Sequence, residues 1–159
     1  KPKTMGLDMY LTKKTFIGAQ YSSTKINVEL AITSNNEPIR IDPKRISYIE
    51  EQVGYWRKAN HIHKWFVDNC CNSEDNCQTV YVDEEKLMKL LSDCKKVKEN
   101  PKLGPELLPT QEGPFFGSIE YDEDYMNDID YTISVIKQLI IEKGTKDYMD
   151  FDIYYRASW

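Results

Sequence analysis

Apolar and polar residues alternate near both ends of the chain, which is the pattern of a β-strand with one buried face. Residues 5–14 (MGLDMYLTKK) and 151–156 (FDIYYR) follow this alternation, and residues 25–32 (KINVELAI) follow it as well. A short apolar run over 78–82 (QTVYV) predicts one more strand. The pattern therefore predicts strands at both termini of the chain and two more between them.

Elsewhere the apolar positions recur with the period of a helix, and each periodic segment has a start or stop signal. The predicted helices cover residues 42–54, 54–69, 84–98 and 120–144. Asp42 followed by Pro43 predicts the first helix start, because a capping carboxylate precedes proline at the first helical position. Asp83 caps the third helix, and Gly144 ends the longest one. The core stripe of the longest helix is predicted to be Tyr125, Ile129, Ile133, Ile136 and Ile140.

Residues 100–118 read as a long loop with four prolines and three glycines, and loops of that length usually bind or cover something. Residues 1–4 precede Met5, which has the context of an initiator, so we interpret them as a remnant or a start-site variant. Residues 5–159 then form one domain. We predict an α+β domain with a small antiparallel sheet that includes both terminal strands and packs against about four helices.

Composition and charge narrow the partners and the compartment. The chain is 40% hydrophobic, enough for a packed core, and its formal net charge of −5 argues against nucleic acid as a partner. The sequence has neither an apolar run of about 18 residues nor a secretory signal, which predicts no membrane partner and a cytoplasmic location. The cysteines are predicted to be reduced: Cys70, Cys71, Cys77 and Cys94.

The segment GYWRKANHIHKWF (54–66) is crowded with aromatic and basic side chains. Interpreted as a helix at about 100° per residue, it has a core face and two edges. The core face comprises Tyr55, Ala59, Ile62 and Phe66. One edge comprises Trp56, Asn60, His63 and Val67, and the other comprises Lys58, His61 and Trp65, which places the Trp65 indole outside the core stripe. Arg57 and Lys64 are expected to face solvent.

Several of these side chains suit the recognition of a polar aromatic ligand. The candidate site comprises Arg57, Asn60, His63 and Trp65, with Gln111 closing over them from the long loop. Trp65 would stack on a ring and Arg57 would meet phosphate. Asn60 or Gln111 would recognise polar edges. His63 is either a neutral imidazole that contacts the ligand or a structural histidine bonded to a carbonyl or to Asn60, and Trp65 is equally consistent with packing beneath the loop.

No cofactor and no metal ion is predicted. The spacing H-x6-C-C-x5-C from His63 to Cys77 lacks the paired C-x2-C units of zinc sites. The acidic segments 73–76 and 120–128 lack the glycine and the spaced carboxylates of a calcium loop. The motifs GxGxxG, GxxxxGK[ST], GxSxG and HExxH are missing too.

Four blocks of the sequence resemble a family of small proteins carried by bacteria and their phages. The blocks are MGLDMYL (5–11), VGYWRKANHIHKWFVDN (53–69), LLPTQEGPFFGS (107–118) and DIYYRASW (152–159). They are specific to the family rather than to an activity. The shared blocks contain Arg57, Asn60, His63, Trp65, Gln111, Tyr154 and Trp159. Carriage by phages implies an accessory role, such as interference with a host defence.

We therefore predict a phage-type accessory protein that binds a nucleotide-like small molecule without turnover, so that binding is favoured over catalysis. One alternative is an inhibitor of a host enzyme that presents the acidic stretch 120–130 to a basic partner protein. Another is a small hydrolase in which His63 acts as general base and Asn60 orients it.

Overall fold

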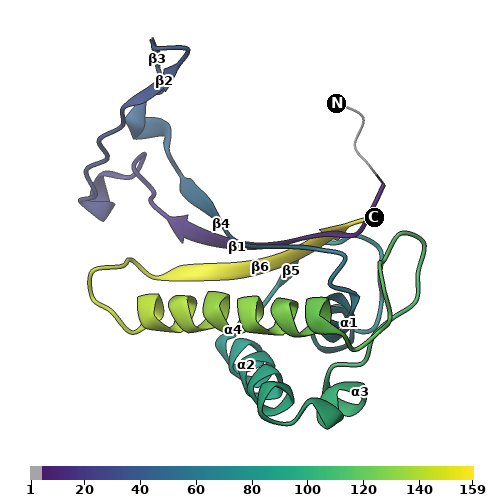
Figure 1. Ribbon diagram of the computed structural model, residues 1–159. Helices are drawn as coiled ribbons and strands as arrows, with labels where there is room; N and C mark the ends of the chain where they lie inside the picture. The colour runs from purple at the N-terminus through teal and green to yellow at the C-terminus, as the bar shows by residue number, and fades with distance from the viewer. Residues whose placement is uncertain (1–4) are drawn as a thin grey trace.

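A four-stranded antiparallel sheet carries the helices on one face, and within the described residues no helix covers its other face (Figure 1). The computed structural model describes residues 5–159. The strands of this sheet are β1 (Asp8–Phe16), β4 (Tyr48–Arg57), β5 (Val80–Tyr81) and β6 (Phe151–Ser158), in the order β4-β1-β6-β5. The helices are α1 (Asn60–Cys70), α2 (Glu84–Glu99), α3 (Gly104–Leu107) and α4 (Glu123–Lys143). Single 3-10 turns are η1 (Ser22–Thr24), η2 (Pro43–Arg45) and η3 (Pro101–Leu103).

The two terminal strands lie side by side in the middle of the sheet. β1 pairs with β4 on one side and with β6 on the other. The register sets Leu11 opposite Tyr155 on the face that meets the helices, and Thr12 opposite Tyr154 on the outer face. The predicted α+β fold, with an antiparallel sheet that contains both terminal strands, is therefore confirmed.

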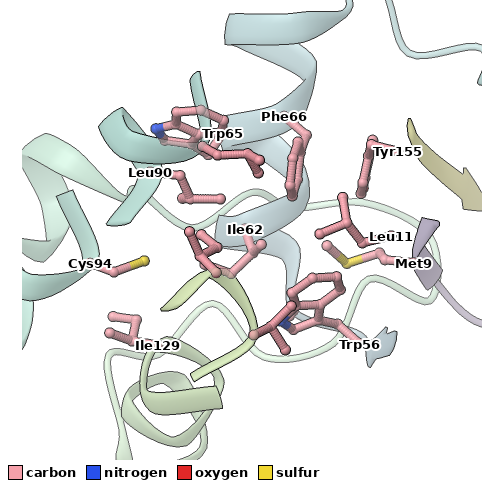
Figure 2. Close-up of a cluster of buried hydrophobic side chains, with 14 of the residues drawn as sticks. Met9, Leu11, Trp56, Ile62, Trp65, Phe66, Leu90, Cys94, Ile129 and Tyr155 are labelled. Carbon is pink, nitrogen blue, oxygen red and sulfur yellow. The ribbon is translucent and has the colours of Figure 1, made fainter. Parts of the chain in front are cut away.

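The core lies between the sheet and the helices and is centred on aromatic rings (Figure 2). Phe66 of α1 stacks on Tyr155 of β6 with ring centroids 3.9 Å apart and an interplanar angle of 9°. Trp56 of β4 meets Phe66 edge-on at 6.4 Å. Aromatic pairs of this kind contribute about 0.5–1.5 kcal/mol beyond the area they bury. The fully buried neighbours of these rings include Met9, Leu11, Ile62, Leu90, Cys94 and Ile129.

Helix α2 begins where the sequence predicts, whereas α4 begins at Glu123, three residues later than predicted. Asp83 caps α2 by accepting a hydrogen bond from the Lys86 amide at 2.8 Å. Asp122 caps α4 in the same way, from the Tyr125 amide at 3.0 Å. The predicted core stripe of α4 is buried at Tyr125, Ile129, Ile133 and Ile136 and half-buried at Ile140. Lys13, on the buried face of β1, reaches Glu142 near the end of α4 at 2.8 Å and so ties the sheet to this helix.

The predicted helix over 42–54 is wrong, because most of that segment is strand β4. The Asp42 cap is real, since its carboxylate accepts a hydrogen bond from the Lys44 amide at 3.0 Å, but the helix it starts is the single turn η2. The chain then becomes extended and pairs along the whole length of β1. The register shifts between Leu11 and Thr12, next to Gly54, where a Cβ atom would lie 2.7 Å from the Trp56 ring. Because Gly54 has no side chain, the Trp56 ring has room to pack against the sheet at this position.

The helix predicted over 54–69 begins later than expected, at Asn60. Residues 54–57 of the predicted helix belong to β4, and Lys58 turns the chain toward α1 with a φ of 60°. Tyr55 consequently lies on the outer face of the sheet and is 39% exposed, so its assignment to the helix core is wrong. Ala59, Ile62 and Phe66 are each fully buried, as predicted.

The strand predicted over 25–32 is also wrong, because residues 25–31 form no regular element. A two-stranded hairpin follows instead, β2 (Ile32–Ser34) and β3 (Glu37–Ile39). Asn35 and Asn36 make its turn with φ angles of 51° and 65°, as a type I′ hairpin turn requires. This hairpin rises from the ends of β1 and β4, away from the helices (Figure 1). The predicted long loop contains η3 and α3 in its first half.

The stacked pair at the centre of the core predicts the largest single loss of stability. Phe66→Ala should lower the free energy of unfolding by about 3–5 kcal/mol, because it opens a cavity between α1 and β6. Phe115→Ala is the matched control, since Phe115 is 53% exposed and its removal should cost less than about 1 kcal/mol. Urea unfolding followed by tryptophan fluorescence measures both, and equal losses would contradict this account of the core.

Candidate functional site

Asn60 anchors the long loop to the first residue of α1. Its side-chain nitrogen donates to the carbonyl oxygens of Phe116 at 3.0 Å and Ser118 at 2.8 Å. Its side-chain oxygen accepts from the Gln111 amide at 2.9 Å. The structure therefore brings Asn60 and Gln111 together, but the contact uses the Gln111 backbone, and the Asn60 side chain is 1% exposed.

His63 lies in a buried polar chain that joins α1 to the end of β6. Its Nδ1 lies 2.7 Å from the Tyr155 hydroxyl, and its Nε2 lies 2.9 Å from the Asp75 carboxylate. A neutral ring protonated on Nε2 satisfies both contacts, because it donates to Asp75 and accepts from Tyr155. Burial raises the pKa of Tyr155 well above its usual value, which keeps that hydroxyl a donor. Asp75 also accepts from the Trp159 indole at 3.1 Å.

Trp65 packs between α1 and α2, so the prediction that its indole lies outside the core is wrong. The side chain is 4% exposed, and its Nε1 donates to Asp93 at 3.0 Å. Lys89 pairs with the same carboxylate at 2.7 Å. The Trp65 indole is therefore buried while its one polar atom, Nε1, keeps a hydrogen-bond acceptor, as is usual for buried tryptophans.

Arg57 is the most exposed of the five candidate residues, and Gln111 is half-buried. It pairs with Asp8 at 3.0 Å, with 39% of its side chain exposed. The Tyr55 hydroxyl donates to the same Asp8 oxygen at 2.6 Å. Asn60, His63 and Trp65 are buried, so the predicted candidates do not line one common cleft.

The four cysteines are free thiols: Cys71 and Cys94 are buried, Cys70 is half-buried and Cys77 is exposed. Burial raises the pKa of Cys70 to about 12 and raises that of Cys94 further, so both stay protonated near neutral pH. In residues 5–159 no group of His, Cys, Asp or Glu side chains is arranged to hold a metal ion. Within the same range, none of the helices has the length and apolar character needed to cross a membrane.

The uncovered face of the sheet collects a different set of polar and aromatic side chains. Successive side chains of a strand point to opposite faces, so the partners of the buried residues face outward. The outward-facing set includes Tyr10, Thr12 and Lys14 of β1, Glu50 and Gln52 of β4, and Tyr154 and Arg156 of β6. The register places Tyr10 opposite Arg156 and Thr12 opposite Tyr154. Three strands therefore contribute to one surface.

This surface is hollowed into a cleft of about 540 Å³. Its lining is Tyr10, Thr12, Lys14, Glu50, Gln52, Thr79, Tyr154 and Arg156. The volume lies within the range of small-molecule sites, which is about 300–1,000 Å³. Tyr10 and Tyr154 are half-buried, so each ring is held by its neighbours and still presents a surface to the cleft.

Rings and cations alternate around this cleft. The Arg156 guanidinium lies 5.4 Å from the centre of the Tyr10 ring. The Lys14 ammonium lies 6.0 Å from the Tyr154 ring and 3.5 Å from the Glu50 carboxylate. Among the described residues, Arg156 forms no ion pair, so its charge is available to an anion. The arrangement can stack a flat ring and neutralise an attached anionic group.

A sequence signal for this surface existed in the alternation of the terminal strands. The solvent-facing positions of β1 and β6 include tyrosines at 10 and 154, side chains that combine an apolar ring with a polar tip and so serve recognition surfaces as well as cores.

Searches against protein-family models, curated protein sequences and solved structures found no match to this chain.

The buried chain through His63 predicts a structural role for that residue. His63→Ala should lower the free energy of unfolding by about 2–4 kcal/mol, because it leaves Asp75 and the Tyr155 hydroxyl without their partner. Lys64→Ala, next in the helix, removes only an exposed pair with Asp68 and should cost less than about 1 kcal/mol. Chemical denaturation measures both variants. A His63→Ala protein as stable as the parent would show that the hydrogen bonds of His63 do not stabilise the fold.

Proposed function

We propose that the protein binds a small anionic molecule with a flat aromatic ring, such as a nucleotide, in the cleft on the uncovered sheet face. The observation that carries this proposal is the grouping of two half-buried tyrosines with Lys14 and the unpaired Arg156 around one cleft. An exposed antiparallel sheet with aromatic side chains is a recognised platform for stacking bases.

The two tyrosines are placed for a ring to lie across neighbouring strands. Tyr10 and Tyr154 are diagonal neighbours on one face, because Tyr10 is paired with Arg156, two positions along β6 from Tyr154. Diagonal neighbours lie roughly 7–8 Å apart, a separation that aromatic side chains can span. A base stacked on such a ring gains about 1–3 kcal/mol.

The two cations are placed for the anionic group. Arg156 offers a planar donor fork that matches phosphate, and Lys14 adds a flexible point charge on the opposite side of Thr12. The Thr12 hydroxyl, the Gln52 amide and the Thr79 hydroxyl line the same cleft and can donate to or accept from the polar edges of a base. The ligand class is the one expected from the sequence, but the site lies elsewhere than the predicted residues.

We propose binding rather than conversion. Glu50 is the one carboxylate among the described residues that line this cleft, and the lining has no second carboxylate, histidine or cysteine to act with it in acid–base or nucleophilic catalysis. Together with the resemblance to phage-borne proteins, this supports a role in sequestering a nucleotide signal. A phage-type accessory protein that sequesters such a signal would interfere with a host defence that depends on it.

A panel of nucleotides and cyclic dinucleotides tests this proposal by thermal shift and calorimetry. A ligand present at about 100 times its dissociation constant should stabilise the fold by about 2.7 kcal/mol. Binding should weaken as salt is raised, because Lys14 and Arg156 neutralise the anion. If no member of the panel shifts the melting temperature, the proposal fails.

Variants of the cleft locate the site. Tyr154→Ala should weaken binding by about 1–3 kcal/mol, whereas Tyr154→Phe should keep most of the affinity because the ring is retained. Arg156→Gln should weaken phosphate-bearing ligands and reduce the salt dependence. Tyr148→Ala and Lys137→Gln are matched controls outside the cleft lining and should bind like the parent. Equal effects at the controls would remove this face as the site.

A further inference from the structure

A second cleft lies at the start of α4 and has the opposite charge character. It has a volume of about 370 Å³. Its walls come from the junction of β4 and α1, from residues 117–120 and from the first turns of α4. The acidic residues in its lining are Glu120, Asp122, Asp124 and Asp128, and the basic ones are Arg57 and Lys58. Arg57 is already paired with Asp8 at 3.0 Å.

The carboxylates of this cleft are only partly balanced by basic residues. Within the described residues, none of these four acids forms an ion pair. Asp122 is partly used, since it caps α4 by accepting from the Tyr125 amide. Asp124 is exposed and Asp128 is half-buried. The four acids therefore outnumber the two basic residues of the lining, Arg57 and Lys58, and the cleft is acidic.

His61 supplies a second and independent feature of this cleft. The side chain lines it, is only 3% exposed and lies against the Tyr125 ring at a centroid distance of 4.2 Å. Its Nε2 is buried and has no hydrogen-bond partner in the part of the chain that the structure describes. Burial lowers the pKa of His61 to about 3, so the ring is neutral near neutral pH. An unsatisfied buried nitrogen is costly and calls for a partner.

We propose that this cleft binds an organic cation, namely an alkyl guanidinium or primary ammonium group, between Asp124, Asp128 and His61. Such a group carries several N–H donors and a positive charge. Its charge would balance the carboxylates, and one of its donors would satisfy the neutral imidazole nitrogen of His61. The acids are not arranged as a set of metal ligands, which favours a group that binds through hydrogen bonds.

The ionisation of Asp128 gives this site a pH signature. Burial, followed by the nearby Asp124 and Asp122, raises the pKa of Asp128 to about 7. The charged or titratable groups that line the cleft with it are Asp122, Asp124 and Tyr125 on α4, Glu120 before it, and Arg57, Lys58 and His61 on the opposite wall. A cation binds the ionised form of Asp128, so affinity should rise as pH increases through 7. Binding should be about tenfold weaker at pH 6 than at pH 8.

Calorimetry with agmatine, spermidine and a capped Gly-Arg-Gly peptide tests the proposal on the full chain. At least one probe should bind, and titration near pH 7 should release protons to the buffer. Binding of the free amines supports a small-molecule source, and binding of the peptide alone supports an arginine of a partner protein. Binding by none of the three probes would overturn the proposal.

Matched variants separate this site from general attraction to an acidic chain. Asp128→Asn should weaken binding about tenfold and abolish its pH dependence. Asp124→Asn gives a second test at an exposed position, in case the first variant folds poorly. Asp130→Asn lies on the same helix, removes the same charge and is paired with Lys98 at 2.6 Å, so it should bind like the parent. Equal losses at Asp128 and Asp130 would overturn the proposal.

His61→Phe keeps the ring against Tyr125 and removes the unsatisfied nitrogen. It should weaken cation binding, because the acceptor for one of the donors of the ligand is lost. A purely structural role for His61 would instead lower the melting temperature and leave binding unchanged. Nucleotide binding on the sheet face should be unaffected, so the two proposed sites are tested independently.

Discussion

The contacts of Tyr155 organise the rest of the structure. Its ring stacks on Phe66 at 3.9 Å, and its hydroxyl meets His63 at 2.7 Å, so one side chain of the last strand is fixed to α1 by both an apolar and a polar contact. The His63 ring continues to Asp75, which holds Trp159. Strand β6 is thereby fixed to the core through Tyr155, and it lies as a central strand beside β1.

The inward orientation of Tyr155 also determines which side chains lie on the opposite face of the sheet. Because Tyr155 must point into the core, its neighbours Tyr154 and Arg156 must point outward. Pairing with β1 then sets Thr12 opposite Tyr154 and Tyr10 opposite Arg156. The packing of the core and the strand register therefore fix the positions of the side chains that line the cleft on the uncovered face. Side chains carried on strands are held more rigidly than side chains on loops, so the lining of this cleft has a well-defined geometry.

Local sequence signals predicted the elements that are stabilised locally. α2 and α4 have capping carboxylates and a clear helical period, and the terminal strands alternate cleanly, so these were foreseen. The segment 42–57 was not foreseen, because Asp42 and Pro43 do start a helical turn and Tyr55 fits the helical period of Ile62 and Phe66. What makes it a strand is pairing with β1, some forty residues earlier in the chain. That interaction leaves no local trace, since β4 is largely exposed over residues 48–52.

The roles of the candidate residues could not be predicted from the sequence for a related reason. Asn60, His63 and Trp65 are polar or amphipathic side chains in an apolar block, and from sequence alone such residues fit either a ligand or an internal partner. A buried polar atom needs a hydrogen bond, and here Ser118, Asp75 and Asp93 provide them. The partners come from distant segments, so their presence could not be read from spacing. Tyr10 and Tyr154 could be placed on outer faces from the alternation, but the strand register was needed to bring them together.

The net charge describes the whole chain but does not give the charge of its individual clefts. The chain carries a formal charge of −5, yet its two clefts differ in sign. The cleft on the sheet has Lys14 and Arg156 against Glu50, whereas the cleft at α4 has four acids against Arg57 and Lys58. Charges act over roughly 8 Å at physiological salt, so each cleft responds to its own lining rather than to the total. Strand β4 contributes to both, with Glu50 and Gln52 in the first cleft and Arg57 in the second. Strand β4 therefore lines two clefts of opposite charge, an arrangement that the net charge of the chain does not reveal.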